Sequence, residues 1–297
     1  FQISAFQEPS LVRLAINALQ GVDSSLITIQ NLSPILLFTS ADRTPRRSPE
    51  FWTRSSSTVA LGNLLNSIGQ FGCIIFLLRR LVHYFGGISE TEKNSKTTSI
   101  FDGNCTVLDR SLINQAFAIS VGKIIEGYVS ALNTLSASVS LRRLSKINAE
   151  GCLSAVGNSE ITLLEVYLHT AGLRSQIEAL GNICKVNHLA LGFPVSSLEE
   201  ICSEAQMEFT AFPRNAALIS FLYAQLKVAD PENCGLLKFL FLQSCEPYCG
   251  FIRSWIFEGT ASDPYNEFVV ESITKNSLNA SADVGVVSWS PLASDRV

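Results

Sequence analysis

The amino-acid sequence predicts an all-α fold of irregular helical bundles joined by loops. Apolar residues recur at three- and four-residue steps through most of the chain, a spacing that places them on one face of a helix. No alternating strand pattern of useful length occurs, and no period of about 34 to 47 residues indicates a helical repeat. The 297 residues suffice for a sizeable core.

A short first helix is expected, with its apolar pattern at residues 11–19. Pro9 and Ser10 are typical of a helix start, and Gly21 suits a left-handed cap at the helix end. The brief run 26–29, Leu-Ile-Thr-Ile, favours an extended segment that is too short for a sheet of its own.

A loop is expected at residues 31–57, because prolines recur there among serines and threonines. Arg43, Arg46 and Arg47 form a basic patch in this loop. Two interpretations of the patch stay open, a solvated surface or a site of phosphorylation or anion binding.

The stretch 55–78 carries no charge and is long enough to cross a bilayer, which takes about 20 residues. Polar and apolar residues nevertheless occupy separate stripes, which predicts a buried amphipathic helix at 59–85 and not a membrane span. The polar stripe consists of Asn63, Asn66, Ser67 and Gln70, and the apolar one of Leu61, Leu64, Leu65 and Ile68. A second loop, polar and without periodicity, is expected at 87–104.

The rest of the chain predicts more helices. A long one follows Asp109, and an uninterrupted one is expected from 163 to 184. Further helices are expected at 214–228, 234–243 and 246–257.

Composition excludes several functions. The formal net charge of −4 disfavours nucleic acid as the main ligand, because phosphate binding needs clustered positive charge. Phosphate-binding glycine loops and the common hydrolase motifs are absent from the sequence. The eight cysteines show no Cys-x-x-Cys spacing, and Cys245 and Cys249, one helical turn apart, have no further ligands nearby. We expect no metal and no cofactor.

No set of candidate catalytic residues stands out. Glu199 and Glu200, or Asp263 and Glu267, are carboxylate pairs of the kind common on solvated faces. The three histidines lie in helical or connecting contexts that favour solvated imidazoles. The sequence therefore predicts that the protein is not an enzyme. Since the chain starts at Phe1 and has one methionine, Met207, we also expect a fragment or a processed form.

The most informative stretch closes the predicted bundle. Trp255 and Ile256 lie on an apolar helix face, and Gly259 ends that helix. Asp263 and Pro264 then start a turn that directs an aromatic segment back to the protein body. That segment contains Tyr265, Glu267 and Phe268.

This order, Trp-Ile-x-x-Gly followed by Asp-Pro-Tyr-x-Glu-Phe, resembles the end of the first grip motif in the gamma-tubulin complex component family. Leu-Gln-Gly at 19–21 and the helix after Ile113 resemble other parts of that family's N-terminal domain. The resemblance covers roughly 8–270, assigns 1–270 to that domain and leaves 271–297 as a divergent, disordered tail. Residues 249–256 resemble component five most.

The resemblance implies a non-enzymatic scaffold, built as an elongated stack of irregular helical bundles. This scaffold would meet other gamma-tubulin complex components side by side and template microtubule nucleation. It places the protein in the cytoplasm, on the cytoskeleton, at a microtubule organising centre or spindle pole. The family's C-terminal half, which contacts gamma-tubulin, has no counterpart here, so gamma-tubulin is expected only as an indirect partner. The signature residues are expected to act structurally.

The first helix is a candidate for the lateral interface, with a buried role as the alternative. Its candidate residues are Leu11, Leu14, Leu19 and Gly21. A competing function is a peripheral membrane or lipid-associated helical protein, suggested by 55–78 and by the positive mean hydropathy of +0.26.

Overall fold

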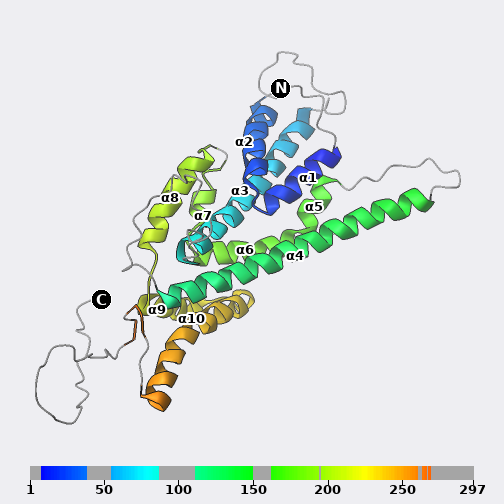
Figure 1. Cartoon of the computed structure of the whole chain (residues 1–297). Coiled ribbons are helices and arrows are strands. Elements are labelled where there is room, and N and C mark those ends of the chain that lie inside the picture. The colour runs from blue at the N-terminus through cyan, green and yellow to red at the C-terminus, as the bar shows by residue number, and fades with distance from the viewer. Residues whose placement is uncertain are drawn as a thin grey trace, which may run out of the picture. The chain divides into compact units, whose positions relative to one another are not determined.

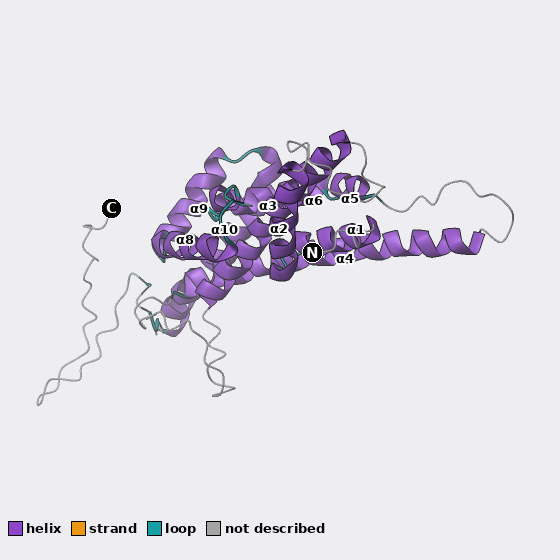
Figure 2. Ribbon diagram, turned by 90° about the horizontal axis from the view of Figure 1, so that it is seen from above, coloured by secondary structure: helices purple, strands orange, loops and turns teal. Residues whose placement is uncertain are grey.

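The structure, a computed structural model, is all-α in the part of the chain that it describes (Figure 1, Figure 2). The described residues are 8–38, 55–86, 111–149, 162–193, 195–259, 263–265, 267 and 268. The expected fold class is thereby confirmed. The expectations for the 43–47 patch, the 87–104 loop and the 271–297 tail lie outside the described residues.

The chain divides into two compact units. The first comprises Phe1–Tyr84 and Val121–Phe212, and the second comprises Phe85–Ser120 and Pro213–Val297. The helices of the first unit are α1 (Glu8–Leu19), α2 (Asp23–Phe38), α3 (Ser55–Gly86) as far as Tyr84, α4 (Leu112–Ala149) from Val121 onward, α5 (Leu163–His169), α6 (Ala171–Ile183), α7 (Asn187–Ala190) and α8 (Leu198–Ala211). The second unit contains the start of α4, α9 (Ala216–Val228) and α10 (Pro231–Glu258).

Helix α3 is the central element of the first unit's core. Every residue from Phe71 to Leu78 on this helix is buried. Gly72 lets α1 approach closely, because a Cβ atom there would lie 2.9 Å from the carbonyl carbon of Ala18. Tyr128 of α4 donates a hydrogen bond of 3.1 Å to the carbonyl of Leu19, and its ring lies 5.9 Å from that of Phe71.

The same helix is the one described segment long and apolar enough to cross a membrane, over Val59–Gly86. Its most apolar window is 72% buried inside the fold. Length and composition alone are weak evidence for a span, since the core helix of a water-exposed fold passes the same test.

The predicted cap at Gly21 is confirmed. Gly21 has φ 73°, in the left-handed region, and α1 ends just before it. Its N–H bonds the Ala18 carbonyl at 2.8 Å, and the N–H of Val22 bonds the Asn17 carbonyl at 3.1 Å. These two bonds form a Schellman cap, which satisfies carbonyls that the helix end would leave free.

Two expectations about the N-terminal region are wrong. Residues 26–29 are helical and not extended, and the expected 31–57 loop is helical at 31–38 and 55–57. Leu26, Ile29 and Ser33 are buried at helical spacing on one face of α2. Burial of that face outweighs the β propensity of the residues, which is a weak and context-dependent preference.

Helix boundaries differ from the sequence expectations at three more places. The expected helix from 163 to 184 breaks at Thr170, whose hydroxyl contacts the carbonyls of Val166 and Tyr167 at 3.0 and 3.1 Å. The two helices expected at 234–243 and 246–257 are one, because α10 continues through Pro247. Helix α8 was not expected.

Helix α8 begins with a capping box that pairs Ser197 with Glu200. The Glu200 carboxylate accepts from the Ser197 N–H at 3.0 Å, and the Ser197 hydroxyl accepts from the Glu200 N–H at 3.2 Å. Glu200, expected to be merely solvated, therefore satisfies a backbone donor at the helix start.

Candidate functional site

The end of α10 carries an aromatic cluster centred on Phe268, within the second unit. The Phe268 ring lies 5.8 Å from that of Tyr248, 5.9 Å from that of Phe251 and 6.3 Å from that of Trp255. Only 7% of Phe268 is exposed. The three partners lie on successive turns of α10, so the segment after the helix folds back along it.

That return depends on two features between α10 and Phe268. Gly259, at φ 66°, ends the helix in the left-handed conformation that glycine adopts most easily. The Asp263 carboxylate then accepts hydrogen bonds from the N–H groups of Tyr265, at 3.1 Å, and Phe268, at 2.6 Å. With Pro264 fixing φ, these bonds hold the turn that directs Phe268 inward.

Glu267 connects this closing motif (Asp263, Pro264, Tyr265, Glu267 and Phe268) to the start of α4. Its carboxylate accepts from the N–H of Leu112 at 2.9 Å and from the Ser111 hydroxyl. A negative charge at a helix N-terminus is favoured, because the first N–H groups lack intrahelical partners. A distant residue thus caps α4.

Asn114 extends the network to the segment before α9. Its side-chain Nδ2–H donates to the Pro213 carbonyl at 3.0 Å, and its Oδ1 accepts from the backbone N–H of Asn215 at 2.9 Å. Asn215 has φ 55°, an uncommon conformation for a residue with a side chain, and Asn114 is 2% exposed. The buried amide therefore holds a bend of the backbone.

This site has little capacity for acid–base or nucleophilic chemistry. The Glu267 carboxylate is engaged by a backbone and a hydroxyl donor, as just described. Burial raises the pKa of the Cys245 thiol on α10, which disfavours a thiolate there. Among the described residues, no group of three or more His, Cys, Asp and Glu side chains could hold a metal.

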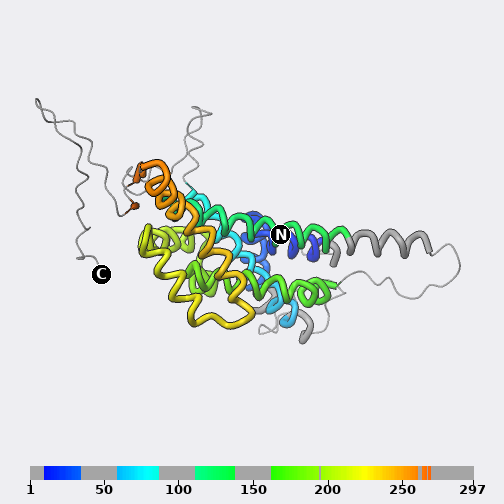
Figure 3. The backbone as a smooth tube through the Cα atoms, turned by 90° about the horizontal axis from the view of Figure 1, so that it is seen from below, coloured from blue at the N-terminus to red at the C-terminus, as the bar shows by residue number. Residues whose placement is uncertain are grey.

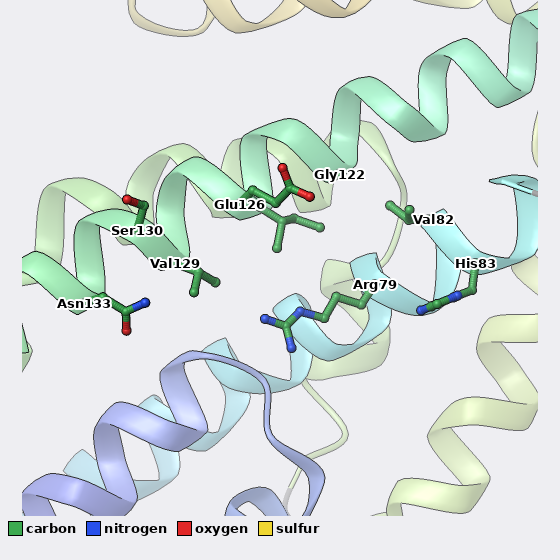
Figure 4. A pocket seen from close by; sticks show the side chains of 9 residues that line it. Arg79, Val82, His83, Gly122, Glu126, Val129, Ser130 and Asn133 are labelled. Atoms are coloured by element: carbon green, nitrogen blue, oxygen red, sulfur yellow. The ribbon is translucent and has the colours of Figure 1, made fainter. Parts of the chain in front are cut away.

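The first unit has a groove of about 400 Å³ between α3 and α4. Arg79 and His83 line it from α3, and Glu126 and Asn133 line it from α4 (Figure 4). Asn133 accepts a hydrogen bond of 2.9 Å from Gln20. Arg79 and Glu126, of opposite charge, both line this groove. Its lining residues do not form any catalytic arrangement that the sequence predicted.

The structure brings most of the predicted signature residues together. Trp255, Asp263, Glu267 and Phe268 form the cluster and network described above, and Pro264 and Gly259 shape the chain between them. Ile256 is 60% exposed and packs outside the cluster. It lies one residue past Trp255, which places it 100° further around the helix.

The candidate interface residues of α1 face the core. Leu11 is 2% exposed, Leu19 is 0% exposed, and Gly21 is buried in its cap. Leu14 is half-buried. Leu11 and Leu19 therefore fit the alternative of a buried role, in which neither side chain is accessible to a partner.

Sequence reasoning missed Ser111 and Asn114, the two side chains that carry most of the network. The pattern Ser-x-x-Asn at 111–114, directly before an apolar helix, is an N-terminal capping signal that could have found them. The Asn114 N–H indeed donates to the Ser111 hydroxyl at 3.0 Å. Nothing local could have indicated that Glu267 joins them, because the contact spans 155 residues.

In the described residues, fold and site together define an α-helical protein. The polar side chains of its site bond backbone groups and helix ends of the same chain. The family follows from comparison with known proteins. The family model described as "Gamma tubulin complex component N-terminal" matches residues 12–289. The chain therefore belongs to the gamma-tubulin complex component family.

Two relatives match shorter stretches. Gamma-tubulin complex component 6 of Homo sapiens is 39% identical over 62 residues, which are 20% of this chain and 3% of that protein. Gamma-tubulin complex component 6 of Mus musculus is 32% identical over 89 residues, 27% of this chain and 5% of that protein. The chain thus aligns with a small part of these relatives' length. No solved structure matches it.

The expected family is confirmed, whereas component five is not supported specifically, because both of these relatives carry the name of component 6. Component five was predicted from the stretch 249–256, which includes the exposed Ile252 and Ile256.

Proposed function

We propose that this chain is a non-enzymatic scaffold element that assembles side by side with other gamma-tubulin complex components and so helps to template microtubule nucleation. The observation that carries the proposal is the family match over residues 12–289. The engagement of Glu267 and Asp263 by backbone N–H groups supports a structural role for the signature residues. The site of action would be the microtubule organising centre or spindle pole.

Contact with gamma-tubulin is proposed to be indirect. The matching family model describes the N-terminal part of these components, and the family resemblance assigns gamma-tubulin contact to the C-terminal half. Residues 12–289 would then contribute the lateral contacts between neighbouring components.

We propose helix α5 as the lateral surface of the first unit. Leu164 is 55% exposed and Leu168 is 62% exposed, and the two lie one turn apart on the same helix face. Helix α5 packs beside α1 (Figure 1), so the predicted involvement of the N-terminal helix would be through this neighbour. Exposed apolar pairs of this kind gain free energy when a partner covers them.

The test is a pull-down of the tagged full chain from cell extract, blotted for gamma-tubulin complex components and for gamma-tubulin. The double variant Leu164→Glu, Leu168→Glu should reduce recovery of the components at least tenfold. The matched control is Leu191→Glu, Met207→Glu, which adds the same charge at positions 71% and 74% exposed. Equal recovery with both double variants would exclude α5, and no recovery with a folded wild-type chain would contradict the scaffold proposal.

Association with a membrane is the alternative function. Its motivation is α3, whose apolar window is 72% buried by other residues of the fold. Insertion into lipid would have to expose that window and break the contacts of Gly72 and Phe71, so we propose membrane binding to be absent. Retention of the chain in a carbonate-washed membrane pellet would overturn this conclusion.

A further inference from the structure

One face of α10 carries large apolar side chains that remain exposed in the described structure. The opposite face of the helix packs into the second unit through Leu237, Leu240 and Phe251. Helix α9 covers part of that inner side, with the Tyr223 ring 5.9 Å from the Phe241 ring (Figure 3). The exposed side chains are Phe239 at 38%, Leu242 at 53%, Ile252 at 37%, Ile256 at 60% and Phe257 at 82%.

Three of these residues belong to a regular stripe along the helix. Steps of three and four residues connect Phe239, Leu242, Glu246, Cys249, Arg253 and Phe257. An average step of about 3.5 residues keeps a stripe on one side of a helix and is the spacing of helices that pair with another helix. The stripe is therefore shaped for a second helix.

The only charged members of the stripe neutralise each other. Arg253 lies 2.7 Å from the Glu246 carboxylate, two turns away on the same face. Both side chains are more than half exposed in the isolated chain. Because the pair has no net charge, covering it leaves no single uncompensated ion behind.

Two pairs of residues in the stripe are also symmetric about its middle. Glu246 and Arg253 lie at equal distances from the point between Cys249 and Gly250, and so do Leu242 and Phe257. A two-fold axis at that point would set Glu246 of one copy opposite Arg253 of the other, and Leu242 opposite Phe257. At the centre, a Cβ atom added to Gly250 would meet nothing within 4 Å, so the backbone is open to close approach.

We propose that two copies of this chain associate through α10, with the two helices antiparallel about a two-fold axis at Cys249 and Gly250. The self-complementary order of charges and apolar side chains specifies a second copy as the occupant, since an isologous interface needs one patch that complements itself. Charge complementarity and apolar burial then act together in one contact. The proposal does not depend on the lateral surface proposed for α5.

The length of the stripe determines how tightly the two copies are expected to associate. From Phe239 to Phe257 it extends about 27 Å, at about 1.5 Å per residue. One pair of helices of this length buries less than the roughly 1,200 Å² typical of stable complexes. The dimer is therefore expected to form in the micromolar range, with a dissociation constant on the order of 10 to 100 μM.

The most direct test is cross-linking with copper phenanthroline and oxygen, which remove two electrons and two protons from a thiol pair to form a disulfide. Cys249 lies next to its own copy at the proposed axis, whereas the copies of the exposed Cys234 would be about 45 Å apart. At about 100 μM chain, the wild type and Cys234→Ser should give a covalent dimer. Cys249→Ser should lose at least nine tenths of it.

A dimer that persists in Cys249→Ser, or the lack of any dimer in the wild type, would overturn the proposal. Sedimentation equilibrium of the reduced chain provides a second readout that no thiol affects. Glu246→Arg should weaken association at least tenfold, and the swap Glu246→Arg, Arg253→Glu should restore it. Monomers at every concentration, or an unchanged mass in Glu246→Arg, would contradict the geometry.

The two proposals can fail separately. The α5 variant Leu164→Glu, Leu168→Glu should leave the α10 dimer unchanged, because the two helices belong to different units. Conversely, Glu246→Arg should leave recovery of gamma-tubulin complex components unchanged. Loss of both activities in either variant would contradict the assignment of separate surfaces.

Discussion

Replacing Gly72 by alanine should destabilise the first unit. The new Cβ atom would lie 2.9 Å from the carbonyl carbon of Ala18 and 2.9 Å from Cδ2 of Leu26, closer than side-chain carbons approach in proteins. The Ala18 carbonyl cannot retreat freely, because it accepts the 2.8 Å bond of the Gly21 cap. The substitution therefore separates α1 from α3 or breaks the cap.

The magnitude follows from two opposing effects. Overpacking of this kind costs about 1 to 3 kcal/mol, with the upper end expected where backbone must move. Alanine returns about 0.5 to 1 kcal/mol, because glycine is unfavourable inside a helix. The net loss is expected to be about 2 kcal/mol, which lowers the unfolding midpoint of a chain this size by roughly 4 to 8 °C.

The assay is thermal unfolding followed by circular dichroism at fixed protein concentration, with Gly127→Ala as the control. Gly127 is exposed on α4, and a Cβ atom there would meet nothing within 4 Å. The control should therefore raise the midpoint by about 1 to 3 °C. If Gly72→Ala raised it equally, the close approach of α1 to α3 would be refuted.

Three further predictions concern buried groups. Glu267→Ala should destabilise the second unit by about 2 to 3 kcal/mol, because it leaves the Leu112 N–H without an acceptor, whereas Glu267→Gln keeps an acceptor and should lose less than half as much. Phe268→Ala should lose about 3 to 5 kcal/mol and Phe268→Leu about 1 to 2, as measured by urea unfolding. Burial raises the pKa of Cys73 to about 12 and raises the pKa of Cys184, so both thiols stay protonated in the folded chain while the unfolded chain ionises from about pH 8.5. Their contribution to stability is full below that pH and falls towards pH 12, and the double variant Cys73→Ala, Cys184→Ala should flatten the decline between pH 8 and 10.5.

Each of these has an outcome that would contradict it. Equal losses in Glu267→Ala and Glu267→Gln would show that the carboxylate does not cap α4. A Phe268→Ala variant as stable as the wild type would exclude the aromatic cluster. An unchanged pH slope in the double cysteine variant would show that both thiols ionise as easily in the folded chain as in the unfolded one.

Helix caps and turns were predictable because their signals are local. Gly21 and Gly259 end helices in the left-handed conformation, as expected of glycines that follow apolar periodic runs. The Asp263-Pro264 turn could be predicted for the same reason, since aspartate bonds the backbone a few residues further along. These features need only neighbouring residues.

Contacts between distant segments could not be predicted this way. The region 26–29 is extended by propensity and helical by burial, and the break expected between residues 243 and 246 lies inside the continuous helix α10. For a related reason the sequence left two roles open for Leu11 and Leu19, since an apolar stripe has the same pattern whether it faces the core or a partner. Packing decides between the two.

By itself, the sequence determined the all-α class, the main helical stretches, the turn after α10 and the family, because periodicity, caps and motifs are properties of short stretches. Only the tertiary structure decided that Glu267 caps α4, that Asn114 holds the bend at Asn215, and which face of α10 stays exposed. The physical reason is that these features depend on groups far apart in the chain. Their energies arise only when folding removes water from both partners at once.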